Sequence, residues 1–125
     1  MKHQPPSHLD KSARQKWREI VVILEERGDV DAGTLDALAA YCVAWSRWTD
    51  AEAKISELGP IVKSPAGFPV ANPYVGIAAA AQRQMRQWGG ELRLTPKARG
   101  RKAEGGEESA VSRILRVMDQ QEATA

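Results

Sequence analysis

The chain has 125 residues, 42% of them hydrophobic, a net charge of +2 and a single cysteine. This length suits one domain with tails, and no apolar run is long enough to span a membrane. The lone Cys42 excludes an intrachain disulfide and fits a reducing cytoplasm, while the polar start of the chain predicts no signal peptide.

Residues 1–10 are predicted to form an extended lead-in, because consecutive prolines in this segment disfavour helix. A helix is expected to follow. Ser12 with Gln15 three residues later has the form of a capping box, and Ser7 with Asp10 offers an earlier start.

The first predicted helix covers residues 11–27 and ends at Gly28. After a short polar connection, a second and longer helix is predicted over residues 34–58, capped by Asp31 or Thr34. The chain is organised around this long helix, whose apolar residues recur at steps near three and four. They are Leu35, Leu38, Cys42, Trp45, Trp48, Ile55 and Leu58.

Residues 61–70 hold two β-favouring dipeptides on either side of a turn, which predicts a small β-hairpin or an ordered loop. Asn72 and Pro73 then predict the cap and first position of a third helix, and Gly89 with Gly90 is expected to end it. The residues of this helix expected to lie against the long helix are Tyr74, Ile77, Ala81, Met85 and Trp88.

The predicted fold is therefore mainly α: a helical hairpin with a long central helix, a short β-hairpin or loop, a third helix and a flexible C-terminal tail. Thr95 is predicted to cap a short helical turn. The expected organisation is an extended lead-in over 1–10, a helical core and oligomerisation domain over 11–99, a flexible linker over 100–108 and a C-terminal amphipathic helix or tail over 109–125.

Charge is distributed unevenly along the chain, with a basic belt late in the sequence. Residues 82–102 hold Glu91 as their single acid. The basic belt consists of Arg83, Arg86, Arg93, Lys97, Arg99, Arg101 and Lys102. Such a belt can bind phosphates, and the alternative is a plain solvated linker over its second half.

Two further apolar groups are candidate contact surfaces. Tyr41, Trp45 and Trp48 are either core residues or part of a subunit interface, where aromatic residues are enriched. In the tail, the apolar stripe is Val111, Ile114, Leu115 and Met118. Its spacing is typical of a helix that docks on a partner, and a solvated tail is the alternative.

Catalytic and metal-binding patterns are not found. The two histidines, His3 and His8, lie in the lead-in without a cysteine or acid at metal-ligand spacing. No glycine-rich phosphate loop is present. We therefore expect no enzyme activity, no metal and no cofactor.

Several short motifs follow one another between residues 5 and 102. They are Pro5-Pro6-x-His8-Leu9, Trp17 with Leu24 and Gly28, Asp36 with Tyr41-Cys42-x-Ala44-Trp45, Lys63-Ser64-Pro65-x-Gly67-x-Pro69-Val70-x-Asn72-Pro73-Tyr74, and Leu94-Thr95-Pro96-x-Ala98-Arg99. In this order the set resembles the small-subunit terminase family of tailed phages and prophages.

The resemblance implies a non-enzymatic, mostly helical homo-oligomer that forms a ring, commonly nine-fold in related proteins, in the host cytoplasm. Such a subunit recognises viral double-stranded DNA to begin packaging and regulates the large terminase subunit, an ATPase and nuclease. We expect the basic belt to contact DNA, part of the aromatic group to join subunits, and the tail stripe to dock on the large subunit.

Two other functions are considered. One is a small dimeric, helical transcriptional regulator, although the second predicted helix is long for a helix-turn-helix and its first turns offer Asp36 and alanines instead of base-reading side chains. The other is a protein-interaction scaffold without nucleic acid, which would leave the basic belt without a partner.

Overall fold

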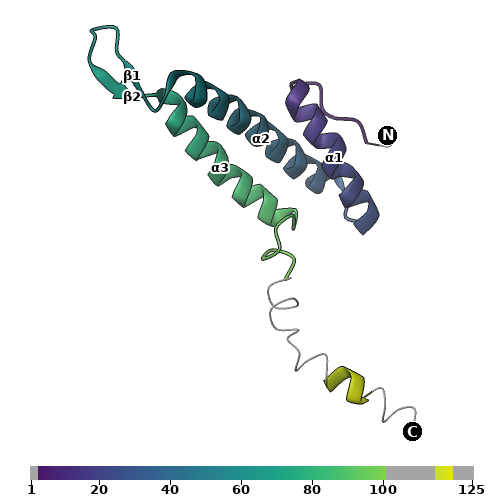
Figure 1. Cartoon of the computed structure of the whole chain (residues 1–125). Helices are drawn as coiled ribbons and strands as arrows, with labels where there is room; N and C mark the ends of the chain where they lie inside the picture. Colours follow the sequence, from purple (N-terminus) through teal and green to yellow (C-terminus); the bar gives the residue numbers. More distant parts are fainter. Residues whose placement is uncertain (1–2, 101–114, 120–125) are drawn as a thin grey trace. The chain divides into compact units, whose positions relative to one another are not determined.

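The computed structural model describes residues 3–100 and 115–119 (Figure 1). It divides the chain into two units, the first ending at Leu92 and the second beginning at Arg93. The elements of the first unit are α1 (Lys11–Arg27), α2 (Ala32–Leu58), β1 (Ile61–Lys63), β2 (Pro69–Ala71) and α3 (Pro73–Glu91). The mainly helical fold with a small β-hairpin is confirmed. Within the described residues, every helix is too short or too polar to cross a membrane.

The bounds of α1 agree with the prediction, but its cap differs. The carboxylate of Asp10 accepts a hydrogen bond from the Ala13 N–H at 2.9 Å, so the expected capping box at Ser12 is wrong. The side chain that precedes the first helical residue is the one that can reach the free N–H groups. Gly28 ends the helix as predicted, with a φ of 72° that a residue bearing a Cβ rarely adopts.

The N-terminal lead-in packs along α1. The indole N–H of Trp17 donates to the His3 carbonyl at 3.1 Å, and Leu9 is buried. A His3–Glu25 contact of 3.5 Å extends this packing toward the end of the helix. These contacts cover the most deeply buried part of α1, around Trp17 and Leu24.

The long helix α2 packs against both α1 and α3 and therefore buries two faces (Figure 1). Leu38, Cys42 and Ser46, four residues apart, form one buried face, while Ala44 and Ala51, seven apart, lie on another. The sequence predicts a single apolar face on this helix, whereas the structure buries two faces. Asp31 caps the N-terminus of α2, because its carboxylate accepts a hydrogen bond from the Thr34 N–H at 2.8 Å. Asp31 is one of the two caps that the sequence predicts.

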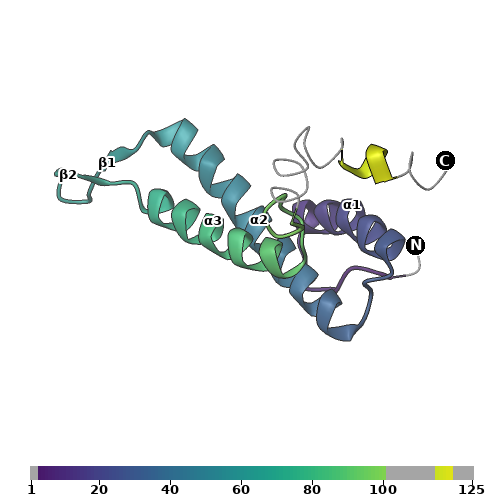
Figure 2. The ribbon, with the colours of Figure 1, turned by 90° about the horizontal axis from the view of Figure 1, so that it is seen from below.

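α2 and α3 run antiparallel, side by side in both views (Figures 1 and 2). Asn72 caps α3 and Pro73 is its first residue, as predicted. The helix continues through Gly89 and Gly90, however, so the predicted end is wrong. Gly89 is buried within the helix, and a Cβ there would lie 3.4 Å from Tyr41, an ordinary van der Waals distance, so this glycine faces α2 and does not stop the helix.

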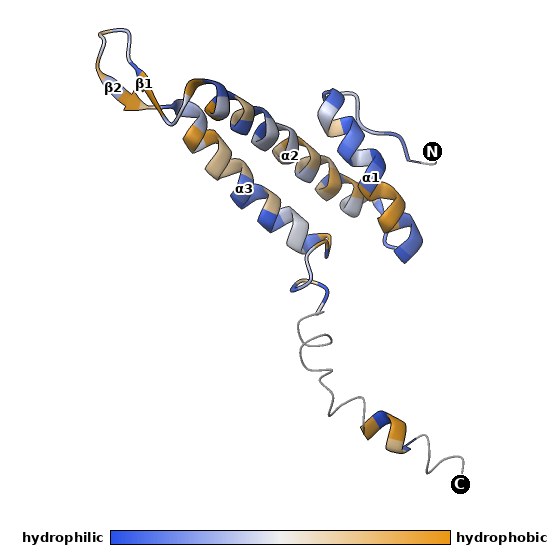
Figure 3. Cartoon of the chain, viewed as in Figure 1, coloured by the Kyte–Doolittle hydropathy of each residue, from blue (hydrophilic) through white to orange (hydrophobic). Residues whose placement is uncertain are grey.

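The predicted β-hairpin is present, with Val62 opposite Val70 in an antiparallel pair. It projects beyond the ends of α2 and α3 in both views (Figures 1 and 2). Both strands include hydrophobic residues (Figure 3). Since no helix covers the hairpin, most of its side chains are exposed to solvent.

The second unit is described over 93–100 and 115–119. Thr95 caps a short turn as predicted, its hydroxyl accepting from the Ala98 N–H at 3.2 Å. Residues 115–119 form a short helical turn. Most of the predicted linker and of the predicted tail helix lies outside the described residues.

Candidate functional site

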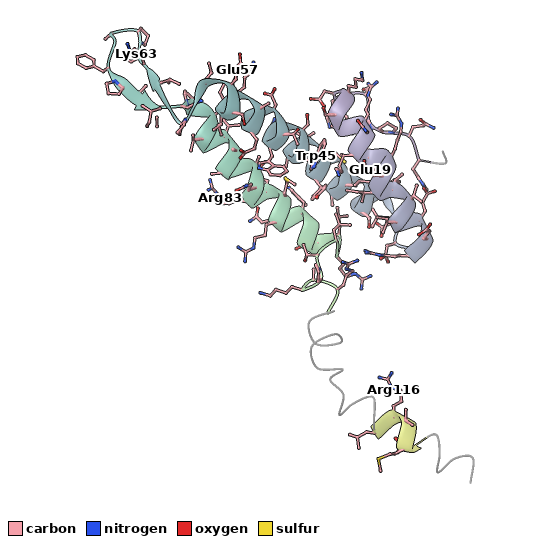
Figure 4. All side chains as sticks on the ribbon, in the orientation of Figure 1. Glu19, Trp45, Glu57, Lys63, Arg83 and Arg116 are labelled. Carbon is pink, nitrogen blue, oxygen red and sulfur yellow. The ribbon has the colours of Figure 1, made fainter. Side chains whose placement is uncertain are left out.

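Arg83 and Arg86 lie one turn apart on α3, outside the helix face that is buried against α2. Both are exposed, whereas Ala78 and Ala81 on the inner face are buried. Figure 4 shows Arg83 pointing away from α2. Among the described residues neither arginine forms an ion pair, so both guanidinium groups are available to an anionic partner.

The rest of the basic belt belongs to the second unit. Arg93 and Lys97 are exposed, and the Arg99 Nε donates to the Thr95 carbonyl at 3.4 Å. Arg101 and Lys102 lie outside the described residues. The structure therefore brings together only Arg83 and Arg86, and it describes the second half of the belt separately.

The aromatic residues predicted as an interface have neighbours in their own chain, and all three are half-buried. Tyr41 lies against Gly89, and burial raises the pKa of its phenol. The Lys16 ammonium lies 4.6 Å from the centre of the Trp45 ring, a cation–π distance. The indole N–H of Trp48 is buried and finds no acceptor in the part of the chain that the structure describes.

The most exposed apolar side chains occur elsewhere. Phe68 and Ile61 of the hairpin region are 69% and 60% exposed. Ile77 and Trp88 of α3 are also exposed, so α2 does not bury them as expected. They lie at the edge of the inner face, and the alanines at its centre bring the helices close. One sign of this exposed apolar surface is visible in the sequence. The third helix carries more bulky apolar residues than its alanine-lined contact with α2 can cover.

Two hollows flank the exposed side of α2. The first, of about 370 Å³, is polar and is lined by Asp10, Ser12, Ser46, Arg47, Thr49 and Asp50. The second, of about 460 Å³, is named here the α2–α3 groove and is mainly apolar. It is lined by Arg47, Asp50, Tyr74, Ile77, Ala80, Ala81 and Gln84.

The polar hollow owes its chemistry to Asp10. The Ser46 hydroxyl donates to its two carboxylate oxygens at 2.9 and 2.7 Å. The hydrogen bond from the Ala13 N–H, followed by that from Ser46, lowers the pKa of Asp10. This carboxylate therefore links the start of α1 to the middle of α2, which is a structural role.

The described residues contain no group of three or more side chains suited to holding a metal ion. Cys42 is fully buried, and burial raises the pKa of its thiol to about 12. The thiol is therefore protonated at neutral pH, and it packs as a small core side chain.

The tail stripe is described only in part. Leu115 and Met118 are exposed on the short helical turn, together with Val117. Val111 and Ile114 lie outside the described residues. The turn offers apolar side chains, but the described residues are too few to form a complete docking helix.

Comparison with known proteins identifies the family to which the chain is similar. Residues 13–109 match the family described as phage terminase, small subunit. None of the curated proteins or solved structures compared with the chain matches it significantly. The family match covers most of the chain, including α1 from its third residue, α2, α3 and the hairpin. The chain therefore belongs to the phage terminase small-subunit family.

Proposed function

We propose that this chain is the DNA-recognition subunit of a phage packaging machine. It assembles into a ring, binds viral double-stranded DNA to start packaging and regulates the ATPase and nuclease of the large terminase subunit. The family match over residues 13–109 is the observation that carries the proposal. The family is generally non-catalytic, and the expected role is recognition and control.

The proposed DNA contact begins with Arg83 and Arg86. They are exposed, share one side of α3 and have no acidic neighbour within the helix before Glu91. Guanidinium groups bind phosphate through paired hydrogen bonds, which position a protein on DNA without reading its sequence. Repeated around a ring, this pair would give affinity and salt dependence with little base specificity. Lys97, Arg99, Arg101 and Lys102 are proposed to extend the contact.

The test is DNA binding by the double variant Arg83→Ala with Arg86→Ala. Each lost phosphate contact lowers the slope of log K against log salt by about 0.9. We therefore expect weaker binding and a slope reduced by roughly two per bound subunit. Lys11→Ala with Arg18→Ala is the matched control, since it removes the same charge from exposed positions on α1.

Retention of wild-type affinity and slope by the α3 variant would refute this contact. If the α1 variant loses binding instead, the DNA site lies on the basic start of the chain. A variant with alanine at Lys97, Arg99, Arg101 and Lys102 tests the second half of the belt in the same assay.

The proposed ring needs an interface between subunits. The interface candidates are half-buried, so part of each aromatic side chain is available to a second copy. They are Tyr41, Trp45 and Trp48. Because ring closure requires two different surfaces that meet head to tail, the aromatic group would supply one side of the contact. Rings of nine subunits are common in related proteins.

The proposed contact with the large subunit uses the tail. Deletion of residues 109–125 should leave assembly intact and abolish stimulation of the large subunit's ATPase. Loss of assembly in this variant would place the tail in the ring instead. Measuring particle mass and ATPase stimulation on the same preparation separates the two results.

A further inference from the structure

The turn of the β-hairpin holds Phe68 in a defined position. The Ser64 N–H donates to the Phe68 carbonyl at 2.8 Å, and the Phe68 N–H donates to the Ser64 hydroxyl at 3.2 Å. Gly67 closes the turn with a φ of 87°, a conformation that favours glycine. Phe68 is the most exposed large apolar side chain among the described residues, yet hydrogen bonds within the turn hold its backbone in place.

The base of the hairpin is also fixed. Asn72 is buried, its side-chain amide donates to the Gly59 carbonyl at 2.8 Å, and its backbone N–H donates to the Pro60 carbonyl at 2.8 Å. These bonds tie the end of α2 to the start of α3 and set where the hairpin leaves the helices. An isolated two-stranded hairpin is at best marginally stable, so this one gains from a surface that the described part of its own chain does not supply.

The α2–α3 groove offers such a surface near the same end of the helices. Tyr74, Ile77 and Ala81 are among its lining residues, and its volume of about 460 Å³ is ample for one aromatic side chain. The hairpin projects away from the helices in both views, so it does not fill the groove of its own chain (Figures 1 and 2). Two neighbouring copies that are offset along the helices would bring the hairpin of one copy to the groove of the other.

The charges on the two surfaces are complementary. Lys63, labelled in Figure 4, is the single charged residue of the hairpin, and it pairs with Pro69, the residue that follows Phe68 in the sequence. The groove lining holds one acidic side chain, Asp50, and one basic side chain, Arg47, and neither forms an ion pair within the described part of the chain, so Asp50 can accept a lysine from a second copy. The last turns of α2 add Glu52 and Glu57 against Lys54 alone, which makes this end of the helix acidic.

Side-chain docking suits this hairpin better than addition of a further strand. Pro69 lies in β2 and has no N–H to donate to a neighbouring strand. The hairpin and the groove are also two different surfaces, so their contact is head to tail and can be repeated around a closed ring.

We propose that Phe68 of one copy inserts into the α2–α3 groove of the next copy, with Lys63 placed beside the partner's Asp50. The inference rests on the proposed ring assembly and gives it a specific contact.

The first test is cysteine cross-linking with Ala66→Cys and Gln84→Cys in one chain, one exposed site on the hairpin turn and one at the groove. The native Cys42 is buried and protonated, so it does not interfere. Mild oxidation should give a ladder of covalent multimers on a non-reducing gel. Each single-cysteine variant should give no species larger than a dimer, because it can pair only with its own counterpart.

The second test is the particle mass of Phe68→Ser, with Val22→Ser on α1 as the control, since both replace an exposed apolar side chain. Loss of a buried phenylalanine weakens each contact roughly tenfold to hundredfold, so we expect a shift to smaller species. The control should keep the wild-type mass. Asp50→Lys should also weaken assembly, and combination with Lys63→Glu should restore it.

If the wild type is a multi-subunit assembly but the double-cysteine variant gives no ladder, or if Phe68→Ser keeps the wild-type mass, this contact is overturned and the proposed ring stays in place. A wild-type protein that is a monomer would overturn both. Circular dichroism of each variant checks that helix content is unchanged, as expected for substitutions at exposed positions.

Discussion

The link between Asp10 and Ser46 gives a sharp test of how α1 is held on α2. In Asp10→Ala the helix loses its cap, which costs about 1 kcal/mol. It also loses the hydrogen bonds from the Ser46 hydroxyl at 2.9 and 2.7 Å. Hydrogen bonds to a charged group contribute about 1.5–3 kcal/mol, and the lower end applies here because Asp10 is exposed to solvent. We expect a total loss of about 2 kcal/mol.

Thermal unfolding followed by circular dichroism at fixed protein concentration measures this loss. For a unit of this size it corresponds to a fall in Tm of roughly 10 °C. Asp36→Ala is the matched control, since it removes an equal charge from an exposed position on α2. If Asp10→Ala lowers Tm no more than this control, the proposed role of Asp10 is refuted.

The pH dependence follows from the lowered pKa of Asp10. Its ionised form is favoured in the folded protein, so the stabilisation is complete above the ordinary value of 3.8 and is lost as the pH falls through the lower folded value. The stability difference between the wild type and Asp10→Asn should therefore shrink as the pH drops below about 4. A difference that stays constant down to pH 2 would contradict the cause assigned to the shift.

Three further predictions concern the core. Gly89→Leu should cost about 2 kcal/mol in thermal unfolding because its side chain meets Tyr41, whereas Gly89→Ala should be nearly neutral; equal effects would show that the close approach is unimportant. Cys42 should resist a thiol reagent at pH 8 until denaturant is added, since its pKa is raised to about 12; rapid reaction in the folded protein would contradict its burial. Trp17→Ala should cost about 3–5 kcal/mol in urea unfolding, because Trp17 is one of the largest fully buried side chains; a loss below 1 kcal/mol would refute its place in the core.

Much of the fold could be predicted because helix boundaries depend on local residues. Gly28 and the Asn72-Pro73 pair mark their ends through backbone chemistry that needs no tertiary contact. The packing of α2 could not be predicted in the same way. Ala44 and Ala51 are buried although alanine contributes little to a hydrophobic pattern, so the second buried face of α2 left no strong periodic signal.

The candidate site was predicted less completely for a related reason. The basic belt could be read from composition, but whether Arg83 and Arg86 share a surface with Lys97 depends on how two separate units are placed. The sequence predicts Phe68 as a hairpin residue and Ile77 as an inner-face residue. It shows that both side chains are apolar, but it does not show which part of the fold covers them. Exposure of apolar side chains is a property of the folded arrangement.

The central claim is that the chain works as a multi-subunit ring. The most direct test is the absolute mass of the purified protein, measured by light scattering on a sizing column at low and high salt. Our account predicts a single species of many subunits, near nine, that persists at high salt because the subunit contact is mainly apolar. A monomer or dimer at both salt concentrations would contradict it and would favour the dimeric regulator.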